Sequence, residues 1–164
     1  MTDRSKIVAV YALTALGASL WISAVLAAPY LWSRESGAAP FLYACFSPIC
    51  HQIPKRSFHL FGRPMAVCAR CFGIYLGFLA GLCVYPFARG FQAVRLPKTT
   101  TFLLLAAPIG FDTAGNFLGL WSTPNLVRFA GGVLWGAILP FYFLTGVSEL
   151  VLFFSRRGGC RTPN

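Results

Sequence analysis

Acidic side chains are scarce in this sequence, which has four Asp and Glu residues against 14 Lys and Arg. Charged residues of all kinds make up only 11 % of the chain, whereas a soluble domain carries roughly 25 %. Too few charges are present to cover a water-exposed globule of 164 residues, and no internal repeat or low-complexity segment is found. These absences exclude a soluble enzyme, a disordered tail and a coiled coil.

Hydrophobic residues, in contrast, make up 57 % of the chain and gather in four long runs. A helix that spans a bilayer needs roughly 20 consecutive apolar residues. The runs therefore predict an all-α membrane protein, a single polytopic domain over residues 1–164 with four transmembrane helices. We expect these helices at about residues 7–32, 71–88, 101–121 and 126–154, with a Cys/His-rich insert at 34–70 between the first two.

The first apolar run also resembles the start of a signal peptide, because Arg4 and Lys6 precede it and residues 24–28 offer a cleavage site. The run covers residues 7–33, which is longer than the ~7–15 apolar residues of a signal core. We therefore expect a retained helix.

Basic residues indicate the orientation, because Lys and Arg are enriched in cytoplasmic loops. Four helices place both termini on one side. That side has the larger set, Arg4, Lys6, Arg89, Arg95, Lys98, Arg156, Arg157 and Arg161, against Arg34, Lys55, Arg56, Arg63 and Arg70 beside the insert. We expect cytoplasmic termini in a prokaryotic inner or plasma membrane. Since the basic residues form no continuous stripe, we expect contact with membrane lipid and no nucleic-acid partner.

Four of the six cysteines and both histidines fall between residues 45 and 71, in the insert and at the first residue of the helix that follows it. The spacing Cys68-x-x-Cys71 lets two thiolates bind one tetrahedral ion, which indicates a zinc site. Cys50 with His51, or Cys45 with Cys50, supplies the other ligands in this interpretation.

Thiol–disulfide chemistry is the alternative interpretation of the same cysteines. Cys68 and Cys71 fall where the second helix begins, and a helix N-terminus and the neighbouring Arg70 both lower a thiol pKa. Cys45 and Cys50 would be the second, shuttling pair of a membrane oxidoreductase that passes electrons to quinone, with the insert on the oxidising side. Structural disulfides or buried thiols are the third interpretation.

Polar residues also interrupt the third and fourth apolar runs. An ionisable group in the membrane costs at least ~2.5 kcal/mol, so Asp112 is expected to have a partner, and Arg128 enters from the same end. Asn116 lies one turn from Asp112. We expect these three side chains to form the floor of a pocket beneath the insert.

Basic residues of the insert are expected at the mouth of that pocket. Arg56, Arg63 and Arg70 would attract an anionic lipid or a quinone-like headgroup, and Ser57 stands beside Arg56. The candidate catalytic residues are Asp112, Arg128, Arg56, Ser57 and Arg70, although the pattern leaves open whether the protein is an enzyme.

Gly73, Gly77 and Gly81 recur every four residues along one face of the second helix. Such a stripe lets another helix backbone approach closely. The stripe predicts helix packing, either within one bundle or in a homo-oligomer.

Four separated blocks of the chain resemble the signature of a family of small prokaryotic membrane proteins, domain of unknown function 2085. The blocks are Cys50-His51-Gln52, Arg56-Ser57-Phe58, Cys68-Ala69-Arg70-Cys71 and Gly73-Ile74-Tyr75-Leu76-Gly77-Phe78, and the family's Asn-x-x-Arg fits Asn125 and Arg128. The resemblance implies a polytopic membrane protein but no activity. It does not extend to Cys45, which favours Cys50, His51, Cys68 and Cys71 as ligands.

We therefore predict a zinc-binding integral membrane protein whose Cys/His site lies at one membrane face, above a polar Asp/Asn/Arg pocket. The alternatives are a quinone-linked thiol–disulfide oxidoreductase and a non-catalytic lipid-binding or scaffold protein.

Overall fold

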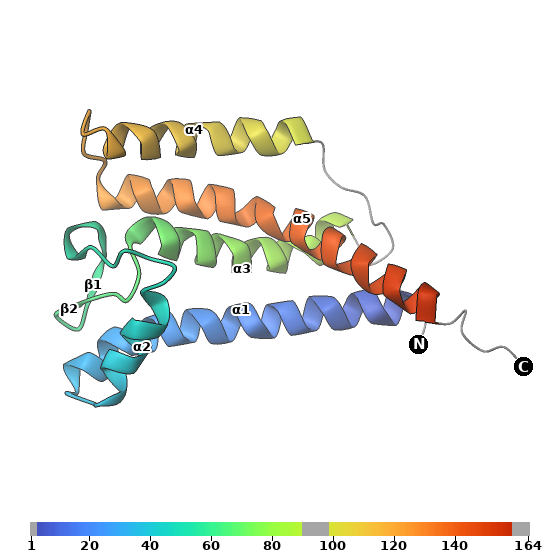
Figure 1. Ribbon diagram of the computed structural model, residues 1–164, viewed down its shortest axis with the longest axis horizontal. Helices are drawn as coiled ribbons and strands as arrows, with labels where there is room; N and C mark the ends of the chain where they lie inside the picture. Colours follow the sequence, from blue (N-terminus) through green and yellow to red (C-terminus); the bar gives the residue numbers. More distant parts are fainter. Residues whose placement is uncertain (1–2, 90–98, 159–164) are drawn as a thin grey trace, which may run out of the picture.

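Four long helices lie side by side in the computed structural model, which describes residues 3–89 and 99–158 (Figure 1). They are α1 (Asp3–Ser33), α3 (Ala69–Arg89), α4 (Thr99–Phe117) and α5 (Asn125–Gly158). α1 begins and α5 ends at the same end of the bundle, while the α1–α3 connection and the α4–α5 turn lie together at the other (Figure 1). Arg95, Lys98, Cys160 and Arg161 lie outside the described residues.

Three of the described helices are long and apolar enough to cross a membrane. They are α1, α3 and α5, over Asp3–Ser33, Ala69–Ala88 and Asn125–Ser155, each with a mean hydropathy of 1.8 in its best window. Many of their large apolar side chains face outward, as lipid contact requires. α4 is not among the three, so the four spans expected from the sequence are not confirmed.

α4 ends at Phe117, earlier than the expected residue 121, because the chain turns there. Gly119 adopts φ +72°, a left-handed conformation that glycine adopts without steric cost. The Leu120 N–H reaches back to the Gly115 carbonyl at 2.9 Å, the long bond of a helix-ending Schellman motif. This turn brings Trp121 back against Gly115.

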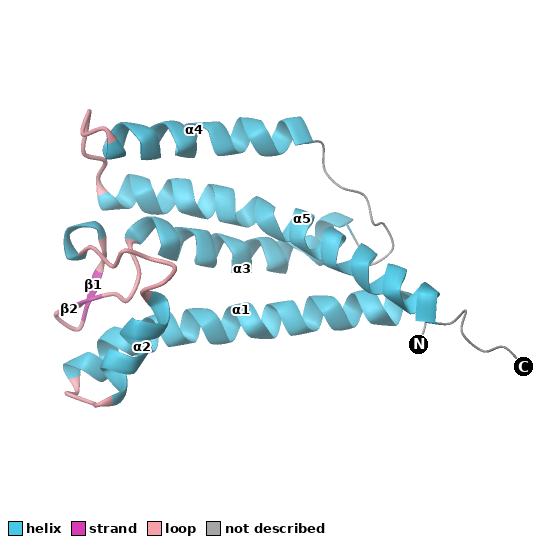
Figure 2. Ribbon diagram, viewed as in Figure 1, coloured by secondary structure: helices cyan, strands magenta, loops and turns pink. Residues whose placement is uncertain are grey.

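The α1–α3 connection is folded, as Figure 2 shows. It contains α2 (Ala38–Phe46), a single 3₁₀ turn η1 (Pro54–Arg56), and strands β1 (His59–Leu60) and β2 (Arg63–Pro64), which pair antiparallel. Phe61 and Gly62 have φ of 55° and 73°, as a two-residue hairpin turn of type I′ requires.

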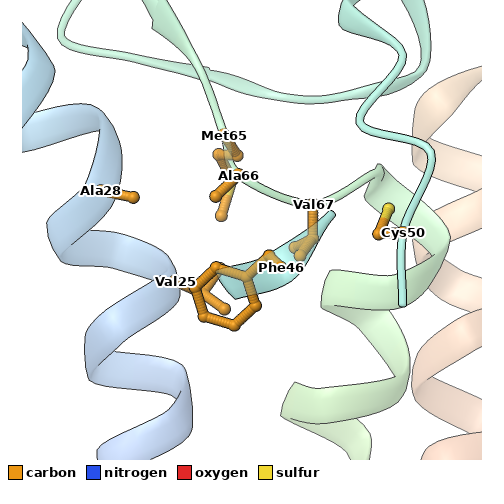
Figure 3. Close-up of a cluster of buried hydrophobic side chains, with 7 residues drawn as sticks. All are labelled: Val25, Ala28, Phe46, Cys50, Met65, Ala66 and Val67. Carbon is orange, nitrogen blue, oxygen red and sulfur yellow. The ribbon is translucent and has the colours of Figure 1, made fainter. Parts of the chain in front are cut away.

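Apolar side chains anchor this connection to the bundle. Val25 and Ala28 of α1, Phe46 of α2, Cys50 and residues 65–67 form one buried cluster (Figure 3). Fully burying a large apolar side chain contributes roughly 1.5–3 kcal/mol. The cluster therefore fixes the position of Cys50 relative to the start of α3.

The predicted glycine stripe forms the contact between α3 and α5. A Cβ at Gly73, Gly77 or Gly81 would collide with the α5 backbone at Phe129, Val133 or Ala137. Gly132 and Gly136 of α5 make the reciprocal close approach to α3. The helix-packing interpretation is confirmed within one chain, and α4 packs on the outer side of α5 (Figure 1).

Candidate functional site

Three thiols meet at the end of the bundle where the folded connection lies. Cys50 follows α2, Cys68 immediately precedes α3, and Cys71 lies in the first turn of α3. The Cys68 N–H donates to Cys50 Sγ at 3.1 Å, and the Cys50 thiol lies within interaction range of the thiols of both Cys68 and Cys71. We call these three residues the thiol cluster.

The thiol cluster forms part of the wall of a cavity of about 450 Å³. Residues from the connection, α3, α4 and α5 line it: Ile49, Cys50, His51, Ile53, Arg56, Cys68, Arg70, Cys71, Thr113, Asn116, Phe117 and Arg128. Candidates that the sequence placed in separate segments therefore share one cavity. Asp112, which pairs with Arg70, and Ser57 are outside the lining.

The Cys68 thiol favours its protonated form in this arrangement. The hydrogen bond with Cys50 and partial burial raise the pKa of Cys68 above its ordinary value. The described cysteines are all free thiols, and Cys45 and Cys83 are exposed and lie outside the cavity lining. Among residues 3–89 and 99–158, no group of three or more His, Cys, Asp or Glu side chains is placed so that it could hold a metal ion.

Asp112 is the centre of a polar network that ties α4 to α3. Its carboxylate pairs with the Arg70 guanidinium and accepts hydrogen bonds from Thr123, Asn116 and Trp121. Arg70 also donates to Thr113 Oγ1 at 2.7 Å. The expected pairing of Asp112 with Arg128 is therefore wrong, because Arg70 reaches across from the first turn of α3.

Arg128 holds the α4–α5 turn instead. Its Nε donates to the Thr123 carbonyl at 2.8 Å, and its terminal NH2 group donates to Asn116 Oδ1. The same Asn116 oxygen accepts the Thr123 N–H at 3.2 Å. Arg128 is only 7 % exposed, so its guanidinium is an internal charge fixed by neutral acceptors.

Ser57 and Asn125 join the connection to α5. The buried Ser57 hydroxyl donates to the Ile53 carbonyl at 3.0 Å, and Asn125 Nδ2 donates to the carbonyls of Lys55 and Ser57 at 3.2 and 3.4 Å. These hydrogen bonds give Ser57 a structural role in joining the two segments. The acceptor of its hydroxyl is a backbone carbonyl and not a base that could activate it.

Arg63 does not lie at the cavity mouth, contrary to expectation. Its guanidinium stacks over the Trp32 ring, 5.0 Å from the centroid, and Arg63 is absent from the lining. The hairpin carries Arg63 toward the C-terminal end of α1. Of the three basic residues expected at the mouth, Arg56 and Arg70 line the cavity.

Gln52 is a residue that sequence reasoning overlooked as a site component. It adopts φ 50°, and its Nε2 donates to the carbonyls of Tyr43 and Ala66 at 2.7 and 2.9 Å. Gln52 thereby clamps the segment after α2 to the segment before α3, which holds Cys50 against Cys68. Its place in the block Cys50-His51-Gln52 was the available signal.

Comparison with known proteins gives the chain's relatives. Residues 50–142, more than half of the chain, match a family described as predicted membrane protein (DUF2085). An uncharacterized protein of Methanocaldococcus jannaschii is 41 % identical over 110 residues, which cover 67 % of this chain and 70 % of that protein. An uncharacterized protein of Methanothermobacter thermautotrophicus is 34 % identical over 90 residues, or 54 % and 78 % of the two chains. No solved structure matches.

Proposed function

The chain belongs to the DUF2085 family of membrane proteins, and from that premise we propose that it binds a transition metal, zinc, at the thiol cluster. The observation that carries the proposal is that Cys50, Cys68 and Cys71 line one cavity, with the Cys68 N–H bonded to Cys50 Sγ at 3.1 Å. Three thiolates are a donor set that zinc prefers.

Several surrounding features support metal binding. The Gln52 clamp and the buried apolar cluster hold the two cysteine-bearing segments together before any ion binds. Arg56 and Arg70 line the same cavity, and their charges favour deprotonated thiols. Because the described side chains do not form a finished metal group, binding requires the thiols to lose protons and close around the ion.

His51 determines which kind of zinc site this is. His51 is exposed and lines the cavity beside Cys50. If His51 is the fourth ligand, the site is closed and structural, whereas a fourth position left to water is the mark of a catalytic zinc. The variant His51→Ala separates the two, because a structural site loses affinity and an open site retains its zinc.

Elemental analysis of the purified protein, reduced and supplied with zinc in detergent, tests the proposal. We expect about one zinc per chain, and loss of it in Cys50→Ser, Cys68→Ser and Cys71→Ser. Cys45→Ser and Cys83→Ser are the matched controls, because these exposed thiols lie outside the cavity. Less than about a tenth of an equivalent of any transition metal in the unmodified chain rejects the proposal.

A second candidate function is that of a quinone-linked dithiol oxidoreductase. It is favoured by a second, apolar cavity of about 350 Å³, which could hold a quinone ring. Residues of α1, α3 and α5 line this cavity, among them Trp21, Tyr75 and Phe78. Tyr75 lies one turn after Cys71. In this reaction the Cys68 and Cys71 thiols lose two protons and two electrons as their S–S bond forms, and a quinone gains both to become a quinol. If the Cys68 and Cys71 thiols remain free in the presence of excess quinone, the oxidoreductase candidate is rejected.

We also propose that α4 is the fourth membrane span and that both termini are cytoplasmic. The support is the excess of basic residues on the terminal side. A membrane-impermeant maleimide applied to intact cells should then label Cys45, which is exposed on α2, and a Cys45→Ser variant is the control. Labelling of Cys45 only after the membrane is opened would reverse the orientation.

A further inference from the structure

Positive charge is concentrated in the cavity beyond what its neighbours neutralise. Three guanidiniums line it, those of Arg56, Arg70 and Arg128. The carboxylate of Asp112 pairs with Arg70. Among the described residues no carboxylate forms an ion pair with Arg56 or Arg128, so the three guanidiniums outnumber the one carboxylate near them, Asp112.

Burial makes the positive charge of Arg128 energetically unfavourable, and an anionic ligand beside it would offset that free-energy cost. Its side chain is 7 % exposed, and its hydrogen-bond acceptors, the Thr123 carbonyl and Asn116 Oδ1, are neutral. A buried charge without an opposite charge is unfavourable. The hydrogen bonds nevertheless fix the guanidinium in place, which is the preorganisation that anion recognition requires.

We propose that this cavity binds a phosphate group, held by Arg56 and Arg128 with Arg70 at its side. Guanidinium groups bind phosphate oxygens through paired, charge-assisted hydrogen bonds. A cavity of about 450 Å³ lies within the range of natural ligand sites. The phosphate would bind in the cavity that the thiol cluster lines. This inference rests on the proposed function only in that a metal ion would occupy the same cavity.

Apolar residues in the cavity lining indicate that the phosphate belongs to an amphiphilic molecule. Ile49 and Phe117 line the same cavity and are 50 % and 90 % exposed. Arg70 and Arg128 of the cavity lining lie near the first residues of α3 and α5, and these helices begin at one end of the bundle (Figure 1), the level where lipid headgroups meet water in a spanning protein. An apolar rim beside a cationic interior fits a lipid phosphate whose acyl chains lie along α4.

Binding of three soluble probes by the full-length protein in detergent tests the proposal: short-chain phosphatidic acid, short-chain phosphatidylcholine and inorganic phosphate. Calorimetric titration should show that phosphatidic acid binds most tightly of the three probes, and that its affinity falls as the salt concentration rises. Arg56→Gln should weaken it roughly tenfold or more. Arg63→Gln is the matched control, because Arg63 stacks on Trp32 outside the cavity.

The outcomes separate the two sources and the two proposals. Inorganic phosphate bound as tightly as phosphatidic acid, and weakened by Arg56→Gln, supports the phosphate site but assigns it to a soluble ligand. Absence of any anion binding, or equal losses in Arg56→Gln and Arg63→Gln, overturns the inference. Zinc content is measured on the same samples. Zinc without phosphate binding refutes only this inference, and phosphate binding without zinc refutes only the metal proposal.

Discussion

Replacing Gly77 by alanine is expected to destabilise the bundle through the contact between α3 and α5. A Cβ at this position would meet Val133 Cα at 2.8 Å and its carbonyl carbon at 2.9 Å, whereas ordinary contact begins at 3.4 Å. The obstructing atoms are backbone, so no rotamer change relieves the clash. The Val133 carbonyl oxygen lies closer still, so the two helices must separate locally by more than 0.6 Å, the difference between 3.4 and 2.8 Å.

The magnitude follows from that separation. A gap of roughly 0.5–1 Å forfeits a quarter to a half of each dispersion contact along the interface. Overpacking of this kind costs about 1–3 kcal/mol, which outweighs the ~0.5–1 kcal/mol that alanine contributes over glycine in a helix. Unfolding in mixed micelles with increasing SDS, followed by circular dichroism, measures the free energy difference.

Gly146→Ala is the matched control, because nothing lies within 4 Å of a Cβ added there in α5. It should leave the stability equal or slightly higher. The double variant Gly77→Ala/Gly136→Ala should cost less than the two single changes together, since the first already opens the interface. A Gly77→Ala protein as stable as the Gly146→Ala protein would refute the reasoning.

Three further substitutions test other parts of the structure by the same unfolding measurement. Asp112→Asn should cost about 1–3 kcal/mol, because it removes the charge opposite a partly buried Arg70; adding Arg70→Gln should cost little more, and full additivity would disprove the pairing. Gln52→Ala should cost about 1–3 kcal/mol by leaving two carbonyls unpaired, and should increase alkylation of the buried Cys50; unchanged alkylation would contradict the clamp. Gly119→Ala should cost about 1–2 kcal/mol at its φ of +72°, whereas Gly37→Ala, at φ −60°, should not; equal effects would count against the turn geometry.

The arrangement of the helices could be predicted because it depends on local patterns. Apolar runs fix helix length to within a few residues, and an up-and-down order then brings the connection and the α4–α5 turn to one end. The glycine stripe predicted close packing but not its partner. That partner is α5 rather than the neighbouring α4, because Gly132 and Gly136 complement the stripe from the other side.

Part of the cavity lining could be predicted from the sequence, and fewer of its contacts. Cys50, Cys68 and Cys71 could be grouped by residue type and spacing. The partner of Asp112 could not, because Arg70 and Arg128 both begin helices at the same end and only the tertiary arrangement selects between them. Gln52 was overlooked because a side chain that binds backbone carbonyls across 14 residues leaves no periodic pattern.

Synthesis from the N-terminus imposes an order of assembly on this interface. The glycine face of α3 emerges first, and Val133, which covers Gly77, is 56 residues further along the chain. Until α5 is made, the glycine face of α3 therefore lacks the helix that covers it. Arg128 belongs to α5, so the cavity is completed only when the last helix is in place. A chain that ends before α5 has its cysteines but an incomplete cavity wall.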